Sequence, residues 1–283
     1  MILPTPQVDA RQNNGWQNDR FHPPHRTIFL LLFTILAGLV LSGCQKPNDS
    51  PAPSQDSASV RNQPAESPIS TDNPPADSNW QSQFAAVLSG ADDTLLIADQ
   101  AITAEQLGQL AQLDGPLEQL LIDAGGVDDD SLSDILAVKS LVHLRLRECR
   151  VGDRGFEQLG TSGLDALRIL NVPQAQVTAH GIASLAALPS LVQLRLGGSQ
   201  LDDSAVAEIA KLPHLRSLHL IGPSLTDAAL SQLANAPKLT SFYLDDCPLS
   251  DSAWELLFAA KPKLHVHIDQ QHHDRDPHQH ESP

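Results

Sequence analysis

The chain repeats itself about every 24 residues over residues 92–268, and this period constrains the fold more than any other feature. In segment 141–151 and again in segment 239–249, apolar residues stand at the first, fourth and sixth positions of a short motif. The third of these apolar positions recurs at intervals of 24 to 26 residues, as Ile97, Ile122, Leu146, Val172, Leu196, Leu220 and Leu244. A period of this length is typical of a solenoid, in which each unit buries its apolar face only against its neighbours.

Each repeat has two halves of different periodicity. Leu191–Leu196 alternates like a strand, whereas Leu225–Ala234 carries apolar residues at helical spacing. We therefore predict an α/β solenoid over residues 80–268, with a curved parallel β-sheet on the inside and short helices on the convex side. Residues Trp80 to Leu88 are predicted to form an N-terminal capping helix.

The motif resembles a known class of repeats. Segments 141–151 and 239–249 fit the pattern L-x-x-L-x-L-x-x-C-x-L, with Cys149 and Cys247 at the ninth position. Together with Leu-Thr-Asp-Ala-Ala-Leu at 225–230, they resemble the cysteine-containing, ribonuclease-inhibitor-like leucine-rich repeats. The resemblance implies a right-handed solenoid that acts as an interaction scaffold and binds partners on its concave face.

The two cysteines of this pattern are predicted to be buried structural thiols. Cys149 and Cys247 lie four repeats apart, which corresponds to about 19 Å at the spacing of adjacent strands. A disulfide needs Cα atoms within about 7 Å.

The N-terminal segment is typical of a targeting sequence. Arg20 and Arg26 precede the apolar run Ile28–Val40, which is shorter than the roughly 20 residues of a membrane span. The run ends in Leu41-Ser42-Gly43-Cys44, which resembles the bacterial lipobox. The resemblance implies a signal peptide over residues 1–43 and a lipidated Cys44 that attaches the protein to a membrane of the bacterial cell envelope. Gln45 resembles the sorting signal for the outer membrane, facing the periplasm or the cell surface; an uncleaved membrane anchor is the alternative.

Two polar segments flank the predicted domain. Residues 44–79 are rich in Pro and Ser and lack apolar periodicity, so we predict a disordered tether, with a glycosylated stalk as the alternative. Residues 269–283 are predicted to be a disordered, His-rich tail. His265 and His267 share one strand face, but short His tracts are only a compositional signal. Metal binding is thus the less favoured alternative, and neither a metal site nor a cofactor is predicted.

Several functional classes are disfavoured. The net charge of −16 argues against a nucleic-acid partner, because phosphate binding needs a basic surface. The sequence contains no Ser-His-Asp set, phosphate-binding loop or Cys-x-x-Cys motif, so we expect neither an enzyme nor catalytic residues.

Acidic and hydroxyl residues recur just before each predicted helix. The predicted N-cap positions are Thr103, Asp128, Gly152, Thr178, Asp202, Thr226 and Ser250. An Asp follows at 129, 153, 203, 227 and 251, where a negative charge favours the helix dipole. We interpret these residues as helix caps rather than calcium ligands.

The candidate binding residues come from strand alternation. Between the buried apolar positions, successive repeats place Leu96, Leu121, Arg145, Asn171, Arg195, His219 and Tyr243 on the concave face. The predicted site comprises His143, Arg145, Arg147, Asn171, Gln193, Arg195, His219 and Tyr243. It forms a cationic and aromatic patch, although Asp123 beside Arg147 could neutralise it. The predicted function is to bind a protein or an anionic polymer there; a structural scaffold or spacer of the envelope is the alternative.

Overall fold

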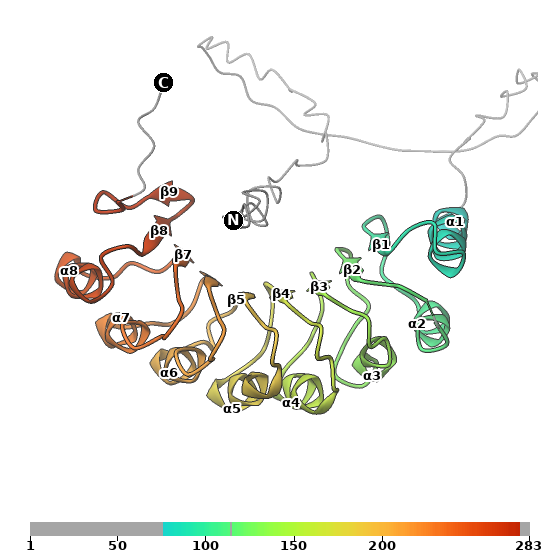
Figure 1. Ribbon diagram of the computed structural model, residues 1–283, viewed down its shortest axis with the longest axis horizontal. Helices are drawn as coiled ribbons and strands as arrows, with labels where there is room; N and C mark the ends of the chain where they lie inside the picture. The colour runs from blue at the N-terminus through green and yellow to red at the C-terminus, as the bar shows by residue number, and fades with distance from the viewer. Residues whose placement is uncertain (1–75, 114, 278–283) are drawn as a thin grey trace, which may run out of the picture. The chain divides into compact units, whose positions relative to one another are not determined.

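The computed structural model describes residues 76–113 and 115–277. Its elements alternate between strand and helix in chain order, starting with the helix α1, Ala76–Leu88. Figure 1 shows the strands on the inner side of a curve and the helices on its outer side. The predicted signal peptide and most of the predicted tether lie outside the described residues; the last four tether residues, 76–79, belong to α1, which begins earlier than predicted. None of the helices in the described part is long and apolar enough to span a membrane.

Nine strands of the described residues form one sheet in sequential order. Neighbours from β1 to β8 pair in parallel, and β9 pairs antiparallel with β8. The strands are β1 Thr94–Ile97, β2 Gln119–Ile122, β3 His143–Leu146, β4 Ile169–Val172, β5 Gln193–Gly197, β6 Ser217–Ile221, β7 Ser241–Asp245, β8 His265–Ile268 and β9 Gln271–His272. This arrangement confirms the predicted repeat and its α/β solenoid.

The outer helices are short because each must return the chain to the next strand within one repeat. They are α2 Ala104–Leu110, α3 Leu132–Leu136, α4 Asp153–Thr161, α5 Ala179–Ser184, α6 Asp203–Ile209, α7 Asp227–Leu233 and α8 Asp251–Ala260. The inward-facing leucines of the strands pack against these helices. Leu194, Leu196 and Leu220 have no exposed surface, as the repeat predicts.

Five of the predicted N-caps are confirmed by side-chain hydrogen bonds to the helix start: Thr103, Thr178, Asp202, Thr226 and Ser250. Gly152 is an N-cap without a side-chain acceptor. The prediction for Asp128 is wrong, because α3 begins only after Ser131. Asp128 forms a parallel bridge with Arg150, and its carboxylate accepts from the amides of Asp130 and Ser131 in the turn that precedes the helix.

Both ends of the sheet are partly covered. At the N-terminal end, the amide of Gln83 in α1 bonds to Leu96 in β1: its Nε2 donates to the Leu96 carbonyl at 3.0 Å, and its Oε1 accepts from the Leu96 amide at 2.8 Å. Trp80 of the same helix is buried, but Leu88 is 58% exposed and contributes less to the cap than predicted.

At the C-terminal end, the structure differs from the predicted disordered tail over residues 269–277. Asp269 and Gln270 adopt positive φ angles of 48° and 65°, and this tight turn brings β9 back alongside β8. The segment packs against the last repeat through two side chains, of which one is buried and one half-buried. Asp276 is 4% exposed, and the ring of His273 packs on Trp254 and Phe258 with centroids 5.1 and 5.0 Å away.

Candidate binding surface on the concave face

The predicted concave column is confirmed strand by strand. Leu96, Leu121, Arg145, Asn171, Arg195, His219 and Tyr243 are direct partners of one another across the seven strands. The column continues one strand further, because Tyr243 is paired with His267 in β8. The sheet thus carries two leucines at its N-terminal end, then charged and polar side chains, then aromatic rings. We call these eight residues the concave column.

The arginines at the start of the polar part share one acidic partner. The Nη2 of Arg145 lies 2.7 Å from the Oδ2 of Asp123, and the Nη1 of Arg147 lies 3.8 Å from the same oxygen. The sequence indicated Arg147 as the residue that Asp123 would neutralise, whereas the shorter pair is with Arg145. The side chain of Arg145 is only 12% exposed, so this ion pair holds the guanidinium in a fixed position.

A second acidic residue organises the C-terminal half of the column. The Nε2 of His219 lies 2.8 Å from the Oδ2 of Asp245. The hydrogen bond from His219 lowers the pKa of Asp245, aided by the charges of His219 and Arg195, and this outweighs the opposing effect of burial. Asp245 is therefore a carboxylate at neutral pH, and it lies beside His219 and within the influence of the Arg195 charge.

The remaining predicted residues lie within or beside the column. Asn171, between Arg145 and Arg195, is 1% exposed, and among the described residues no donor reaches its Oδ1. His143 and Gln193 are half-buried in the neighbouring column on β3 and β5. The structure brings all eight predicted residues to one face, but interleaves them with Asp123 and Asp245, so the patch is one of alternating charge rather than a uniformly cationic one.

Tyr243 joins this surface to a group of histidines that the sequence did not predict as a site. Its ring centroid lies 5.6 Å from that of His219, 5.9 Å from His265 and 5.0 Å from His267. Burial, assisted by the nearby charges of His272 and His265, lowers the pKa of His267 to about 4, so this ring is neutral at neutral pH. The alternation of His265 and His267 was visible in the sequence, but the return of His272 was not.

Cys149 and Cys247 are both buried and free, as predicted. Burial raises the pKa of the Cys149 thiol to about 11, and its Sγ donates to the carbonyl of Arg147 at 3.2 Å. A thiol that is protonated and hydrogen-bonded in this way is a poor nucleophile.

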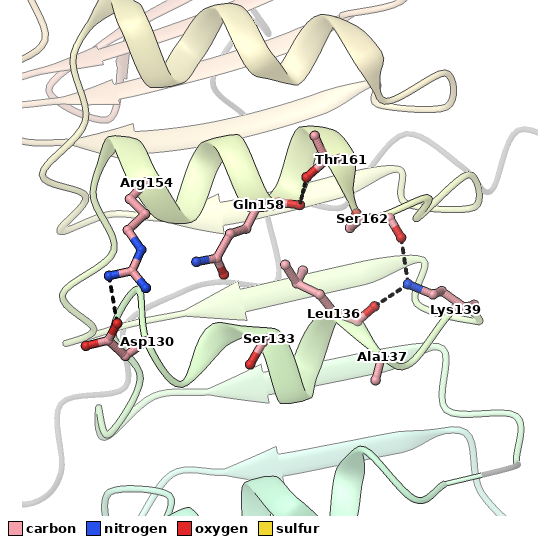
Figure 2. A pocket seen from close by; sticks show the side chains of 9 residues that line it. All are labelled: Asp130, Ser133, Leu136, Ala137, Lys139, Arg154, Gln158, Thr161 and Ser162. Atoms are coloured by element: carbon pink, nitrogen blue, oxygen red, sulfur yellow. Dashed lines mark hydrogen bonds and ion pairs between the residues drawn. The ribbon is translucent and has the colours of Figure 1, made fainter.

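A groove of about 450 Å³ lies on the other side of the sheet, between α3 and α4. Figure 2 shows its charged side chains engaged with their neighbours. Arg154 pairs with Asp130 at 2.7 Å, and the Nζ of Lys139 donates to the carbonyls of Leu136 and Ser162 at 2.7 and 2.6 Å. These contacts link the residues that flank α3 to α4 of the next repeat.

The parallel inner sheet, the 24-residue repeat and the outer helices define the class: this chain folds as a leucine-rich-repeat solenoid. A scan against protein-family models and a search of curated proteins find no match.

Solved structures with similarity to this fold include an internalin from Listeria monocytogenes, with 18% identity over 65% of this chain and 58% of that chain and a TM-score of 0.46. A leucine-rich-repeat protein from Leptospira interrogans is similar at 18% identity over 63% of this chain and 49% of that one, with a TM-score of 0.39. A plant peptide hormone receptor in complex with RGF2 is similar at 19% identity over 63% of this chain and 28% of that one, with a TM-score of 0.38. The chain therefore spans less than two thirds of the length of each of these proteins.

Proposed function

We propose that the protein is a lipid-anchored binding protein of the bacterial cell envelope, and that its concave column binds a protein ligand. The observation that carries the proposal is the composition of this column in the structure. A spacer needs only small polar residues on its inner face, whereas binding surfaces concentrate Arg, Tyr and other large side chains at their centres. Arg145, Arg195, His219 and Tyr243 follow one another along the column, interrupted only by Asn171.

The contacts of these side chains with neighbouring carboxylates indicate that the surface is preorganised. Asp123 holds Arg145, and Asp245 holds His219, so little conformational entropy is lost when a ligand docks on them. Asn171 supports the proposal further, because a buried acceptor without a donor is costly and a ligand could supply that donor.

The same contacts favour a protein over an anionic polymer as the ligand. Two carboxylates lie among the three arginines of this face, at Asp123 and Asp245. A polyanion would meet both of them, whereas a protein surface can match each charge with its opposite.

The membrane anchor is proposed from the sequence of residues outside the described part. The apolar run Ile28–Val40 followed by Leu41-Ser42-Gly43-Cys44 supports processing before Cys44, which leaves residues 44–283. Mass spectrometry of the native protein should find an acylated Cys44 as the first residue. A chain that keeps Met1 in the membrane would contradict the anchor without affecting the proposal for the concave column.

Photo-crosslinking in the native cells tests the binding proposal. A photoreactive phenylalanine analogue replaces Tyr243 in one variant and Gln232, an exposed residue of α7 on the convex side, in the control. We expect discrete adducts with a protein from position 243 alone, and their loss when Arg195→Ala is added. Equal adduct patterns from the two positions would instead indicate a scaffold or spacer.

A further inference from the structure

Three histidine rings meet at the C-terminal end of the sheet. His265 and His267 alternate on β8 and therefore share a face, and His272 on β9 is the direct antiparallel partner of His267. The ring centroids lie 4.7 Å apart for His265 and His267, 5.1 Å for His265 and His272, and 4.1 Å for His267 and His272. One ligand atom from each ring lies within 4.8 Å of the others.

A buried carboxylate lies beside the Nδ1 atoms of two of these rings. The side chain of Asp276 has no exposed surface, and its Oδ2 lies 2.8 Å from the Nδ1 of His265 and 3.3 Å from the Nδ1 of His272. The same oxygen accepts from the backbone amide of Val266 at 2.9 Å. A carboxylate at the Nδ1 side of a histidine directs the lone pair of Nε2 outward, as in many zinc sites where a carboxylate supports the ligating histidine.

We propose that His265, His267 and His272 bind one zinc ion, with Asp276 as the positioning residue for His265 and His272. The Nε2 atoms of His265 and His267 already face each other at 3.0 Å. Zinc bound to imidazole at about 2.0–2.1 Å in a tetrahedron requires roughly 3.3 Å between ligand atoms. Small rotations about the side-chain bonds therefore suffice to open this pair and to bring the third ring closer.

The donor set decides the class of metal. Imidazole nitrogens favour Zn²⁺ and its first-row neighbours, whereas Ca²⁺ and Mg²⁺ require oxygen ligands. Three histidines leave the fourth zinc position for water or for an atom of a ligand. All three rings are half-buried rather than sealed, so the ion can enter from solvent.

The position of the site gives it a structural consequence that is independent of the proposed concave ligand. Two of its histidines belong to β8 and one to β9, so a bound ion would join the last repeat to the returning strand. His267 also belongs to the concave column, where its ring lies 5.0 Å from Tyr243. The zinc site thus lies at the C-terminal end of that column.

Titration of the full-length protein with Zn²⁺ tests this inference. The protein is purified in detergent, stripped with a chelator, and studied by isothermal titration calorimetry. We expect one ion per chain, and a bound Co²⁺ should show the visible absorption of a tetrahedral site. Loss of a supporting carboxylate typically weakens metal affinity about 10- to 100-fold, so we expect that range for Asp276→Asn and a larger loss for His267→Ala.

Two control variants separate this site from other histidines. His180→Asn alters an exposed histidine of α5 that pairs with Glu157, and His278→Asn with His280→Asn alters the two histidines beyond the described residues. Both controls should keep the stoichiometry and affinity of the parent. Zinc should also raise the melting temperature of the parent but not of the His267→Ala variant, and circular dichroism checks that this variant is folded. Absence of binding by the parent, or equal binding by a folded His267→Ala variant, would overturn the proposal.

Discussion

The carboxylate of Asp227, in the first turn of α7, accepts hydrogen bonds from both the amide and the hydroxyl of Ser250, at 2.9 and 2.6 Å. Ser250 is the N-cap of the next helix, α8. Asp203 contacts Thr226 in the same way, and Asp153 contacts Thr178. These three aspartates therefore connect their repeats to the following ones, in addition to any effect on the dipole of their own helices.

Replacement of Asp153 by Asn should remove part of this connection. Asp153 accepts from the amide and hydroxyl of Thr178 and from the amide of Gly181. Hydrogen bonds to a charged acceptor contribute about 1.5–3 kcal/mol, so we expect a loss of about 1–3 kcal/mol in the free energy of unfolding at pH 7. Chemical denaturation of the two proteins measures the difference.

The difference between parent and Asp153→Asn should depend on pH. Burial raises the pKa of Asp153, but the hydrogen bonds from Thr178 and Gly181 more than offset it, so the folded pKa lies below the ordinary value of 3.8. The contribution of the carboxylate is therefore complete above the unfolded pKa and is lost as the pH falls through the folded pKa. The two unfolding free energies should begin to converge as the pH falls below about 4, the ordinary pKa of an Asp carboxyl, and should meet only below the folded pKa of Asp153. A constant difference down to about pH 2 would contradict this account.

Two glycine substitutions in helices should have opposite effects. A Cβ at Gly181 would lie 2.6 Å from the Oδ1 of Asp153, whereas a Cβ at Gly108 in α2 meets nothing within 4 Å. Overpacking costs about 1–3 kcal/mol and exceeds the gain of about 1 kcal/mol in helix propensity, so Gly181→Ala should destabilise the protein. Gly108→Ala should stabilise it by about 0.5–1 kcal/mol. Thermal melts of the two variants provide the comparison. If both substitutions stabilised the protein, the close approach of Asp153 to Gly181 would not depend on the missing Cβ.

The strand leucines should dominate stability. Leu196 has no exposed surface, so Leu196→Ala should cost about 2–5 kcal/mol through lost burial and a residual cavity. Gln232, exposed on α7, should tolerate Ala with a change of at most about 0.5 kcal/mol. Urea unfolding of both variants tests this, and equal effects would contradict the register of the repeat.

Asp123→Asn should make the concave face more cationic. Asp123 lies 2.7 Å from Arg145 and 3.8 Å from Arg147, so its neutralisation leaves two arginines without their shared carboxylate. We expect this variant to elute from a heparin column at higher salt than the parent. Asp130→Asn is the matched control, because Asp130 pairs with Arg154 at 2.7 Å on the convex side. Equal shifts for the two variants would show an effect of net charge alone.

The repeat period was sufficient to predict the sheet and the order of the concave column. Because side chains alternate and the repeats are nearly equal in length, one register places Arg145, Asn171, Arg195, His219 and Tyr243 opposite one another. The choice of ion-pair partner could not be predicted in the same way. Both arginines reach Asp123, and side-chain rotamers rather than register decide that Arg145 lies closer.

The sequence did not predict the histidine site, because the third histidine comes from the chain that follows the last repeat. The turn at Asp269 and Gln270 adopts positive φ angles without a glycine or asparagine, so the sequence contained no signal for a hairpin there. Without that turn, His272 belongs to a polar tail. The sequence also contained no indication of a role for Asp276, because this residue is buried beside His265 only when the chain turns back after β8.

Gln83 affects how copies of this protein can contact one another. An unprotected strand edge is a template on which another chain can continue the sheet. The side-chain amide of Gln83 occupies the donor and acceptor of Leu96 in the first strand, and the antiparallel β9 covers part of the last. A second copy could continue the sheet at β1 only by displacing Gln83 from Leu96, so joining of sheets at this end should be disfavoured even where copies of the protein are crowded.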